Sequence, residues 1–120
     1  MEKSEKKLIK LIKLGDKESF GILYDRYIEK IYQYIYYKTH HKETAEDLTS
    51  LTFVKSLDYL PGFNEDNGNF KAWLYRIARN NIIDHYRTKK IEYNIGVSLN
   101  IHTFAIKQHL RLKQIAHSLK

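Results

Sequence analysis

The sequence predicts an all-α protein, a compact bundle of about four helices followed by a linker and a short C-terminal helix. Apolar residues recur every three or four positions in several long stretches, which is the spacing of one face of a helix. The single proline and most of the five glycines fall between these stretches, where they end helices. We expect one helical domain at residues 1–90 and a linker with a partial helical tail at 91–120. A chain of 120 residues can bury roughly two-thirds of its unfolded surface, enough for a core without disulfides.

The first two helices are predicted at residues 4–14 and 18–38. In the first, Leu8, Leu11 and Ile12 face inward, and Gly15 ends the helix. Asp16 then serves as a possible N-cap, because its carboxylate can accept hydrogen bonds from the first amides of a helix. The second helix has the most regular apolar spacing, formed by Phe20, Leu23, Tyr24, Tyr27, Ile28, Ile31 and Ile35. Further tyrosines between 32 and 37 widen this face, which predicts core packing and leaves room for a docking surface.

A third helix is predicted from a polar break at 39–42 to about residue 60. Its first turns carry Glu43, Glu46 and Asp47, which complement the positive end of the helix dipole. Residues 41–70 have a net charge of −4, whereas the whole chain has +7. An acidic block between basic ones indicates two different partners on two surfaces.

Residues 61–69 form the loop richest in turn-forming residues. Pro61 and Gly62 end the third helix, and Phe63 is the one apolar side chain that follows. Two interpretations stay open, a plain connector whose Phe63 folds back onto the core, or a binding loop.

The fourth helix, predicted at 69–90, has three distinct sides. The core side is formed by Phe70, Leu74, Ile77, Ala78 and Asn81. The second side is basic and carries an amide, with Arg76, Arg79, Asn80, Ile83 and Arg87. The third is an edge formed by Tyr75, Ile82 and Tyr86. Such a face suits nucleic acid, since Arg and Lys neutralise phosphates, an Asn can recognise a base edge, and aromatic rings stack on unpaired bases. A solvated basic face above core aromatics is the alternative.

Two segments of the chain resemble a known family. The segment FKAWLYRIARNNIIDHYR is similar to regions 2.3 and 2.4 of bacterial RNA polymerase sigma factors of the extracytoplasmic-function (ECF) type. The matching residues are Phe70, Trp73, Leu74, Ile77, Ala78, Asn80, Asp84 and Arg87. Upstream, AEDLTSLTF at 45–53 resembles region 2.2 of the same family, in the right order and at a suitable distance. The resemblance covers about residues 19–90.

The resemblance implies three sites. The third helix would bind the clamp coiled coil of the polymerase's largest subunit through Glu46, Asp47 and Leu48, although Ser50 and Leu51 replace the family's Gln-Glu pair. The fourth helix would bind the promoter −10 element through Arg76, Arg79, Asn80, Ile83, Arg87, Tyr75 and Trp73. The loop would capture one base of the non-template strand, using Phe63, Asn64, Asn67 and Asn69. An anti-sigma factor is a further partner that the family allows.

Several other functions are not predicted. Cysteine is absent, which excludes disulfides and thiolate metal sites. The six histidines form no His-x-x-x-His pair, no Gly-rich phosphate loop is present, and no arrangement activates a nucleophile. We therefore expect a non-enzyme without cofactors. No apolar run approaches the length of a membrane span and the first residues lack a signal peptide's apolar segment, so we expect a cytoplasmic protein.

Within residues 102–120, the segment LRLKQIAHSL resembles only the opening of the family's region 4, the helix-turn-helix that recognises the −35 element. The sequence therefore predicts region 2 with region 4 largely missing, and binding to the −10 element without −35 recognition. Two rival functions stay open. One is a truncated sigma-like module that occupies polymerase without initiating transcription, and the other is a generic basic helical DNA-binding domain.

Overall fold

The computed structural model describes residues 4–88, and the predictions made for 89–120 lie outside the described residues. It confirms the all-α prediction, with no strand among residues 4–88. The elements are α1 (Glu5–Lys13), α2 (Lys17–Thr39), α3 (Lys42–Tyr59), the short 3-10 helix η1 (Leu60–Gly62) and α4 (Phe70–Thr88). Each predicted helix is present within two residues of its predicted ends, over the part of the chain described.

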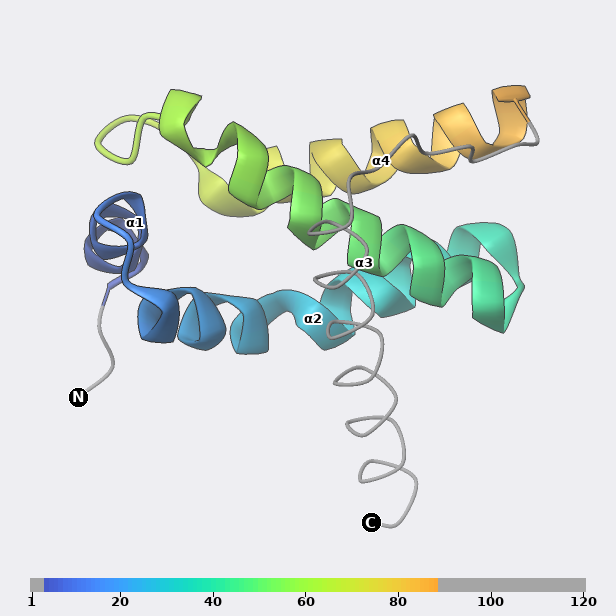
Figure 1. Cartoon of the computed structure of the whole chain (residues 1–120). Helices are drawn as coiled ribbons and strands as arrows, with labels where there is room; N and C mark the ends of the chain where they lie inside the picture. Colours follow the sequence, from blue (N-terminus) through green and yellow to red (C-terminus); the bar gives the residue numbers. More distant parts are fainter. Residues whose placement is uncertain (1–3, 89–120) are drawn as a thin grey trace, which may run out of the picture.

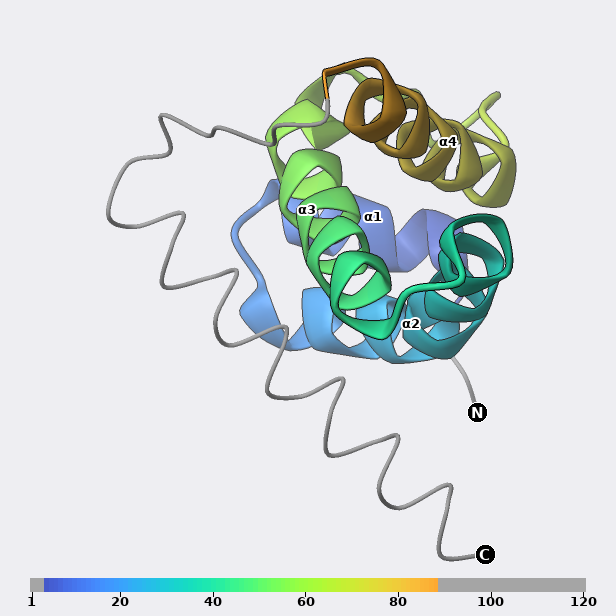
Figure 2. The same cartoon turned by 90° about the vertical axis from the view of Figure 1, so that its right-hand side faces the viewer.

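Helices α2, α3 and α4 pack together, and α1 closes one end of them. Helix α3 contacts both α2 and α4, while α1 contacts α2 and η1. Figure 1 shows α1 nearly end-on beside the start of α2, with the loop between η1 and α4 directly above it. In the view of Figure 2, α2, α3 and α4 surround a common interior. The loop therefore lies beside α1, and α4 packs against both α3 and α2.

Helix α1 is held to the bundle by apolar and polar contacts. The Ser4 hydroxyl caps its N-terminus by accepting from the Lys7 amide at 3.2 Å. Leu8 and Ile9 are buried, so the inward side is rotated from the predicted Leu8, Leu11 and Ile12, of which the last two are only half-buried. The Tyr27 hydroxyl on α2 donates to the Glu5 carboxylate, and burial followed by this bond raises the pKa of Tyr27. These contacts fix α1 on the start of α2.

The turns between helices use the expected residues with one difference. Gly15 ends α1 with a φ of 96°, a conformation that glycine adopts without strain. Asp16 precedes α2, but its carboxylate accepts from the Ser19 hydroxyl at 2.6 Å rather than from a backbone amide. His40 ends α2 in the left-handed region, and its amide donates to the Tyr36 carbonyl at 2.7 Å. Asp16 is therefore the N-cap residue as predicted, but the expected bond from its carboxylate to a backbone amide of α2 is not formed.

Helix α3 buries several hydroxyl side chains, which donate hydrogen bonds to carbonyl groups of the same helix. Thr49 and Thr52 each donate to the carbonyl four residues earlier at 2.7 Å, and Ser50 does so at 3.0 Å. Such bonds remove the cost of burying a hydroxyl without a partner. The helix can therefore pack closely against two neighbours while carrying few large apolar residues.

One buried amide joins α4 to α3. Asn81, 2% exposed, donates from its side-chain nitrogen to the Thr52 hydroxyl at 3.1 Å. Its side-chain oxygen accepts from the Lys55 ammonium at 2.9 Å. Both partners lie on α3, so this single residue fixes the rotation of α4 about its axis as well as its distance from α3.

We predict that Asn81→Ala lowers the free energy of unfolding by about 2 kcal/mol, because it removes the buried amide that donates to the Thr52 hydroxyl and accepts from the Lys55 ammonium. Denaturant unfolding followed by circular dichroism measures the change. Asn80→Ala is the matched control, since Asn80 is the exposed neighbour on the same helix, and it should shift stability by no more than about 0.5 kcal/mol. Equal effects of the two substitutions would contradict the role given to Asn81.

Candidate nucleic-acid interface

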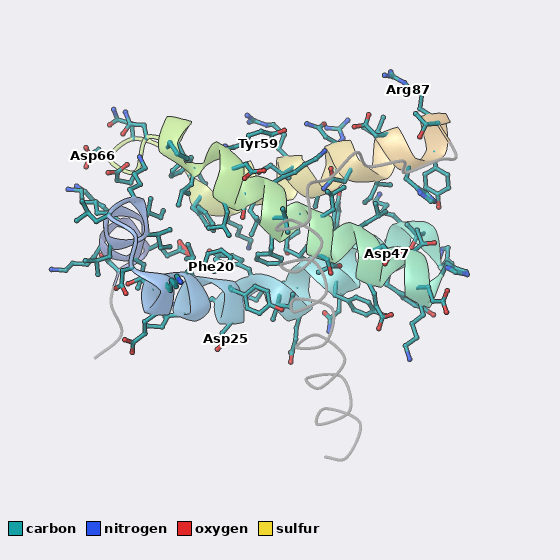
Figure 3. The ribbon with its side chains drawn as sticks, in the orientation of Figure 1. Phe20, Asp25, Asp47, Tyr59, Asp66 and Arg87 are labelled. Atoms are coloured by element: carbon teal, nitrogen blue, oxygen red, sulfur yellow. The ribbon has the colours of Figure 1, made fainter. Side chains whose placement is uncertain are left out.

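The outer face of α4 presents a row of basic residues around one amide. Arg76, Arg79, Asn80 and Arg87 are all exposed, and Ile83 lies among them with 42% of its surface exposed. Figure 3 shows Arg87 extending away from the bundle at the far end of the helix. The structure thus brings the five predicted residues together on one accessible side. This geometry permits phosphate contacts along the helix with an amide and a methyl-bearing side chain between them.

The opposite face of α4 is the core face that the sequence predicts. Phe70, Leu74, Ile77, Ala78 and Asn81 are each less than 9% exposed, and Ile82 joins them at 8%. The predicted edge of Tyr75, Ile82 and Tyr86 is therefore divided, with Ile82 in the core and Tyr86 exposed. The hydroxyl of Tyr86 donates to the Lys38 carbonyl of α2 at 3.4 Å.

The two aromatic residues assigned to the DNA site are half-buried. Trp73 packs against the rings of Phe63 and Phe70, at centroid distances of 4.9 Å and 5.6 Å. Tyr75 meets Tyr34 of α2 edge-on at 5.2 Å, and burial raises the pKa of Tyr75. Each ring is held on one side and exposes part of its surface. They can offer a fixed edge to an unpaired base, and they also belong to the packing of α4.

The loop at 63–69 is built around the ring of Phe63. This ring is 7% exposed and packs against Phe70 and Trp73 of α4. A Cβ at Gly68 would lie 2.6 Å from both the Phe63 ring and the Asn64 carbonyl oxygen, so only glycine allows the loop to close there. Of the two interpretations of Phe63, folding back onto the core is confirmed. Its ring is in the core, which leaves no face for stacking on a base.

The asparagines of the loop differ in what they leave available. The Asn64 side-chain oxygen accepts from the amides of Asp66 at 2.9 Å and Asn67 at 3.3 Å. The Asn69 side-chain oxygen caps α4 by accepting from the Ala72 amide at 3.1 Å. Asn67 is exposed at the tip, and among the described residues its side chain takes part in none of these bonds. The Asn67 side chain and the side-chain nitrogens of Asn64 and Asn69 are therefore the amide groups of this loop that these bonds leave available.

Three lysines of α1 contact the same loop. The Lys13 ammonium lies 2.5 Å from the Phe63 carbonyl oxygen and 2.6 Å from a Glu65 carboxylate oxygen. Lys6 and Lys10 approach the Asp66 carboxylate at 2.9 Å and 3.9 Å. These bonds hold the pKa of Glu65 and of Asp66 below the usual carboxyl range. The sequence does not indicate these contacts, because opposite charges some fifty residues apart give no local signal.

The three residues assigned to polymerase binding differ in exposure. Asp47 is exposed on α3, and Figure 3 shows it at the surface of that helix. Leu48 is fully buried in the hydrophobic core, and Glu46 is 1% exposed. The structure therefore leaves Leu48 no surface to offer a partner, because its side chain fills the core of the bundle. Of the three residues, only Asp47 is exposed.

Two further features of the described residues are negative. Within residues 4–88, no group of three or more His, Cys, Asp or Glu side chains is placed to hold a metal ion. No helix of that same part of the chain combines the length and the apolar character needed to cross a membrane.

Comparison with known proteins gives consistent matches. The chain is 40% identical over 88 residues to the ECF RNA polymerase sigma factor BldN of Streptomyces coelicolor, covering 73% of this chain and 33% of the relative. It is 40% identical over 99 residues to the ECF RNA polymerase sigma factor SigW of Bacillus subtilis, covering 82% and 52%. It is 41% identical over 71 residues to the RNA polymerase sigma factor YlaC of the same bacterium, covering 59% and 40%.

The chain spans between a third and about half of the length of these relatives. Residues 23–91 match the sequence model of the Sigma-70 region 2 family, and this match runs from α2 through α3 to the end of α4. The matched segment therefore contains the basic outer face, the loop at 63–69 and the core that positions them. Since the match covers more than half of the sequence, this chain belongs to the Sigma-70 region 2 family.

Proposed function

We propose that this protein is an ECF-type sigma factor, or the region 2 part of one, which binds core RNA polymerase and recognises and opens the promoter −10 element. The observation that carries the proposal is the exposed row of three arginines and Asn80 on α4, in a chain whose residues 23–91 match Sigma-70 region 2. Three relatives are named as RNA polymerase sigma factors, which supports the same assignment. The polymerase supplies the catalysis, and this chain supplies recognition.

The mechanism follows from the chemistry of the outer face. Arg76, Arg79 and Arg87 neutralise backbone phosphates and so set the position of the DNA, but they carry no sequence information. The Asn80 amide can donate to and accept from one base edge, which discriminates between bases. The exposed methyl groups of Ile83 add an apolar contact beside it. Affinity and specificity are thus assigned to different residues of the same helix.

Strand opening is assigned to the start of α4 and the loop before it. Trp73 and Tyr75 present ring edges there, and Asn67 lies at the loop tip. Unstacking and unpairing a base costs a few kcal/mol, and capture of the extruded base offsets part of this cost. In this proposal the loop holds one non-template base by hydrogen bonds to its edge, with Asn67 as the principal contact.

Binding to the polymerase is assigned to the exposed part of α3 near Asp47. Helix α3 carries four acidic and two basic residues, a net charge of −2, opposite in sign to α4. Opposite charges on the two surfaces keep each partner on its own side, because like charges across an interface are strongly unfavourable.

We predict that Arg79→Ala and Arg87→Ala weaken binding to single-stranded −10 DNA for all sequences alike. Each lost phosphate contact should reduce the slope of log affinity against log salt by about 0.7. Asn80→Ala should leave the salt slope unchanged and reduce the preference between bases by roughly 1–3 kcal/mol. Fluorescence anisotropy over a salt series, with oligonucleotides that differ at one position, measures both quantities.

Lys17→Ala serves as the matched control, since it removes an exposed positive charge from α2 rather than from α4. Wild-type salt slopes and wild-type base preference in all three α4 variants would place the DNA contact on another face. Equal affinity for duplex and single-stranded DNA would favour a generic basic binder instead.

We predict that Asp47→Lys weakens binding to bacterial core RNA polymerase at least tenfold without changing helix content. The physical reason is that the substitution reverses a charge in the proposed contact, whereas an exposed substitution changes stability by only about 0.5 kcal/mol. A titration of labelled protein with core enzyme measures the affinity. Glu18→Lys is the control, because it reverses an exposed negative charge in the first turn of α2 rather than on α3. This variant should bind as the wild type does. Unchanged affinity of Asp47→Lys would remove α3 from the docking assignment.

A further inference from the structure

The loop at 63–69 is bonded to α1, a helix that has no role in the proposed function so far. Lys6, Lys10 and Lys13 project from α1 toward this loop, and Figure 3 shows Asp66 directly above α1. The ends of the loop are fixed by η1 and α4, to which it is connected along the chain. The α1 contacts add a third attachment, which comes from about fifty residues earlier in the sequence.

Among these lysines, Lys13 has the strongest attachment. Its ammonium bonds two acceptors of the loop, the Phe63 carbonyl at 2.5 Å and the Glu65 carboxylate at 2.6 Å. The side chains of Lys13 and Glu65 are only 24% and 15% exposed, whereas those of Lys6 and Asp66 are 54% and 58% exposed. Water and salt screen an exposed pair strongly, so the pairs of Asp66 contribute little. The Lys13 contacts are therefore the ones able to hold the loop.

These contacts act on the part of the loop that sets its shape. The Phe63 carbonyl belongs to the residue whose ring packs under Gly68 and against Trp73. Beyond it, the Gly68 amide donates to the Asn64 carbonyl at 2.7 Å and closes the turn that carries Asn67. Helix α1 itself is fixed on the bundle by buried Leu8 and Ile9. Contacts from α1 that fix Phe63 and Glu65 therefore also restrict the position of the loop tip, because the turn that carries Asn67 is closed.

We propose that Lys13 is a positioning residue for base capture, which holds the loop at 63–69 in the conformation that accepts an unpaired base. This inference rests on the proposed function, and it adds α1 to the parts of the protein that determine base specificity. A loop held in its binding conformation loses less conformational freedom when the base arrives, and it presents its amides at fixed positions. Lys13 itself contacts the loop and need not contact the DNA.

The test compares Lys13→Met with Lys7→Met. Both remove one positive charge from α1 and keep a long apolar side chain, but Lys7 is exposed and its side chain makes no ion pair among the described residues. Asn67→Ala tests the captured-base contact itself. The probes are single-stranded −10 oligonucleotides that differ at one base, and the measured quantity is the ratio of their dissociation constants.

We expect Lys13→Met to reduce this ratio at one position at least threefold, while Lys7→Met keeps the wild-type ratio. Both variants should weaken binding to all oligonucleotides by a similar small factor, because both lose one positive charge. Lys13→Glu should reduce the ratio further, because a carboxylate at this position repels both the Phe63 carbonyl and the Glu65 carboxylate. Equal ratios in Lys13→Met and Lys7→Met, at a position where Asn67→Ala reduces the ratio, would overturn the role of Lys13.

A second readout needs no DNA. Trp73 is the single tryptophan of the chain and packs against Phe63, so its emission reports on the packing of the loop. We expect a red shift of this emission and faster exchange of the Gly68 amide in Lys13→Met but not in Lys7→Met, with similar melting temperatures. Unchanged emission and exchange in Lys13→Met would overturn the inference. A wild-type protein that distinguishes no bases would overturn the proposed function, and the inference with it.

Discussion

The packing of α4 against α2 and α3 is the constraint on which the functional surface depends. A helix turns by about 100° per residue, so a rotation of α4 by about this angle would exchange an outward residue with its inward neighbour. Asn80 and Asn81 show this directly, because one is exposed and the other is 2% exposed. Two bonds from Asn81 to α3, together with the buried Leu74 and Ala78, select one rotation. The arginines face outward because the opposite face of α4 is apolar and is buried against α2 and α3.

The faces of α4 could be predicted from the sequence because they follow from local spacing. Apolar residues at three- and four-residue intervals define a core side, and whatever alternates with them must face outward. The same apolar spacing predicts the core side of α2, where Leu23, Ile28 and Ile31 are buried. Apolar spacing predicts the buried side of α1 less well, because Ile9 rather than Leu11 is buried beside Leu8. In a short helix with apolar residues on several sides, the neighbour it packs against decides the rotation.

The parts that could not be predicted depend on contacts distant along the chain. Nothing near Lys13 in the sequence indicates that it bonds a carbonyl fifty residues later. The asparagines of the loop looked equivalent as hydrogen-bonding groups, but two of their side-chain oxygens stabilise the loop and the start of α4. The resemblance also assigned Leu48 to a docking surface, although its side chain lies in the core. A sequence motif identifies a segment, but it does not show which side chains of that segment are buried. Local pattern identifies the segments that form a site, and tertiary packing decides which atoms remain available.

The internal bonding of the loop bears on how base capture can be favourable at all. Ordering a flexible loop of seven residues would cost on the order of 10 kcal/mol in backbone entropy. Hydrogen bonds to one base edge return only about 1–3 kcal/mol. A loop that became ordered only on binding would therefore not hold an extruded base. Here the Phe63 ring beneath Gly68, the Asn64 turn and the Lys13 contacts order the loop before DNA arrives. In the proposed base capture, the aromatic cluster and α1 would therefore support recognition by removing this entropic cost, without contacting the DNA themselves.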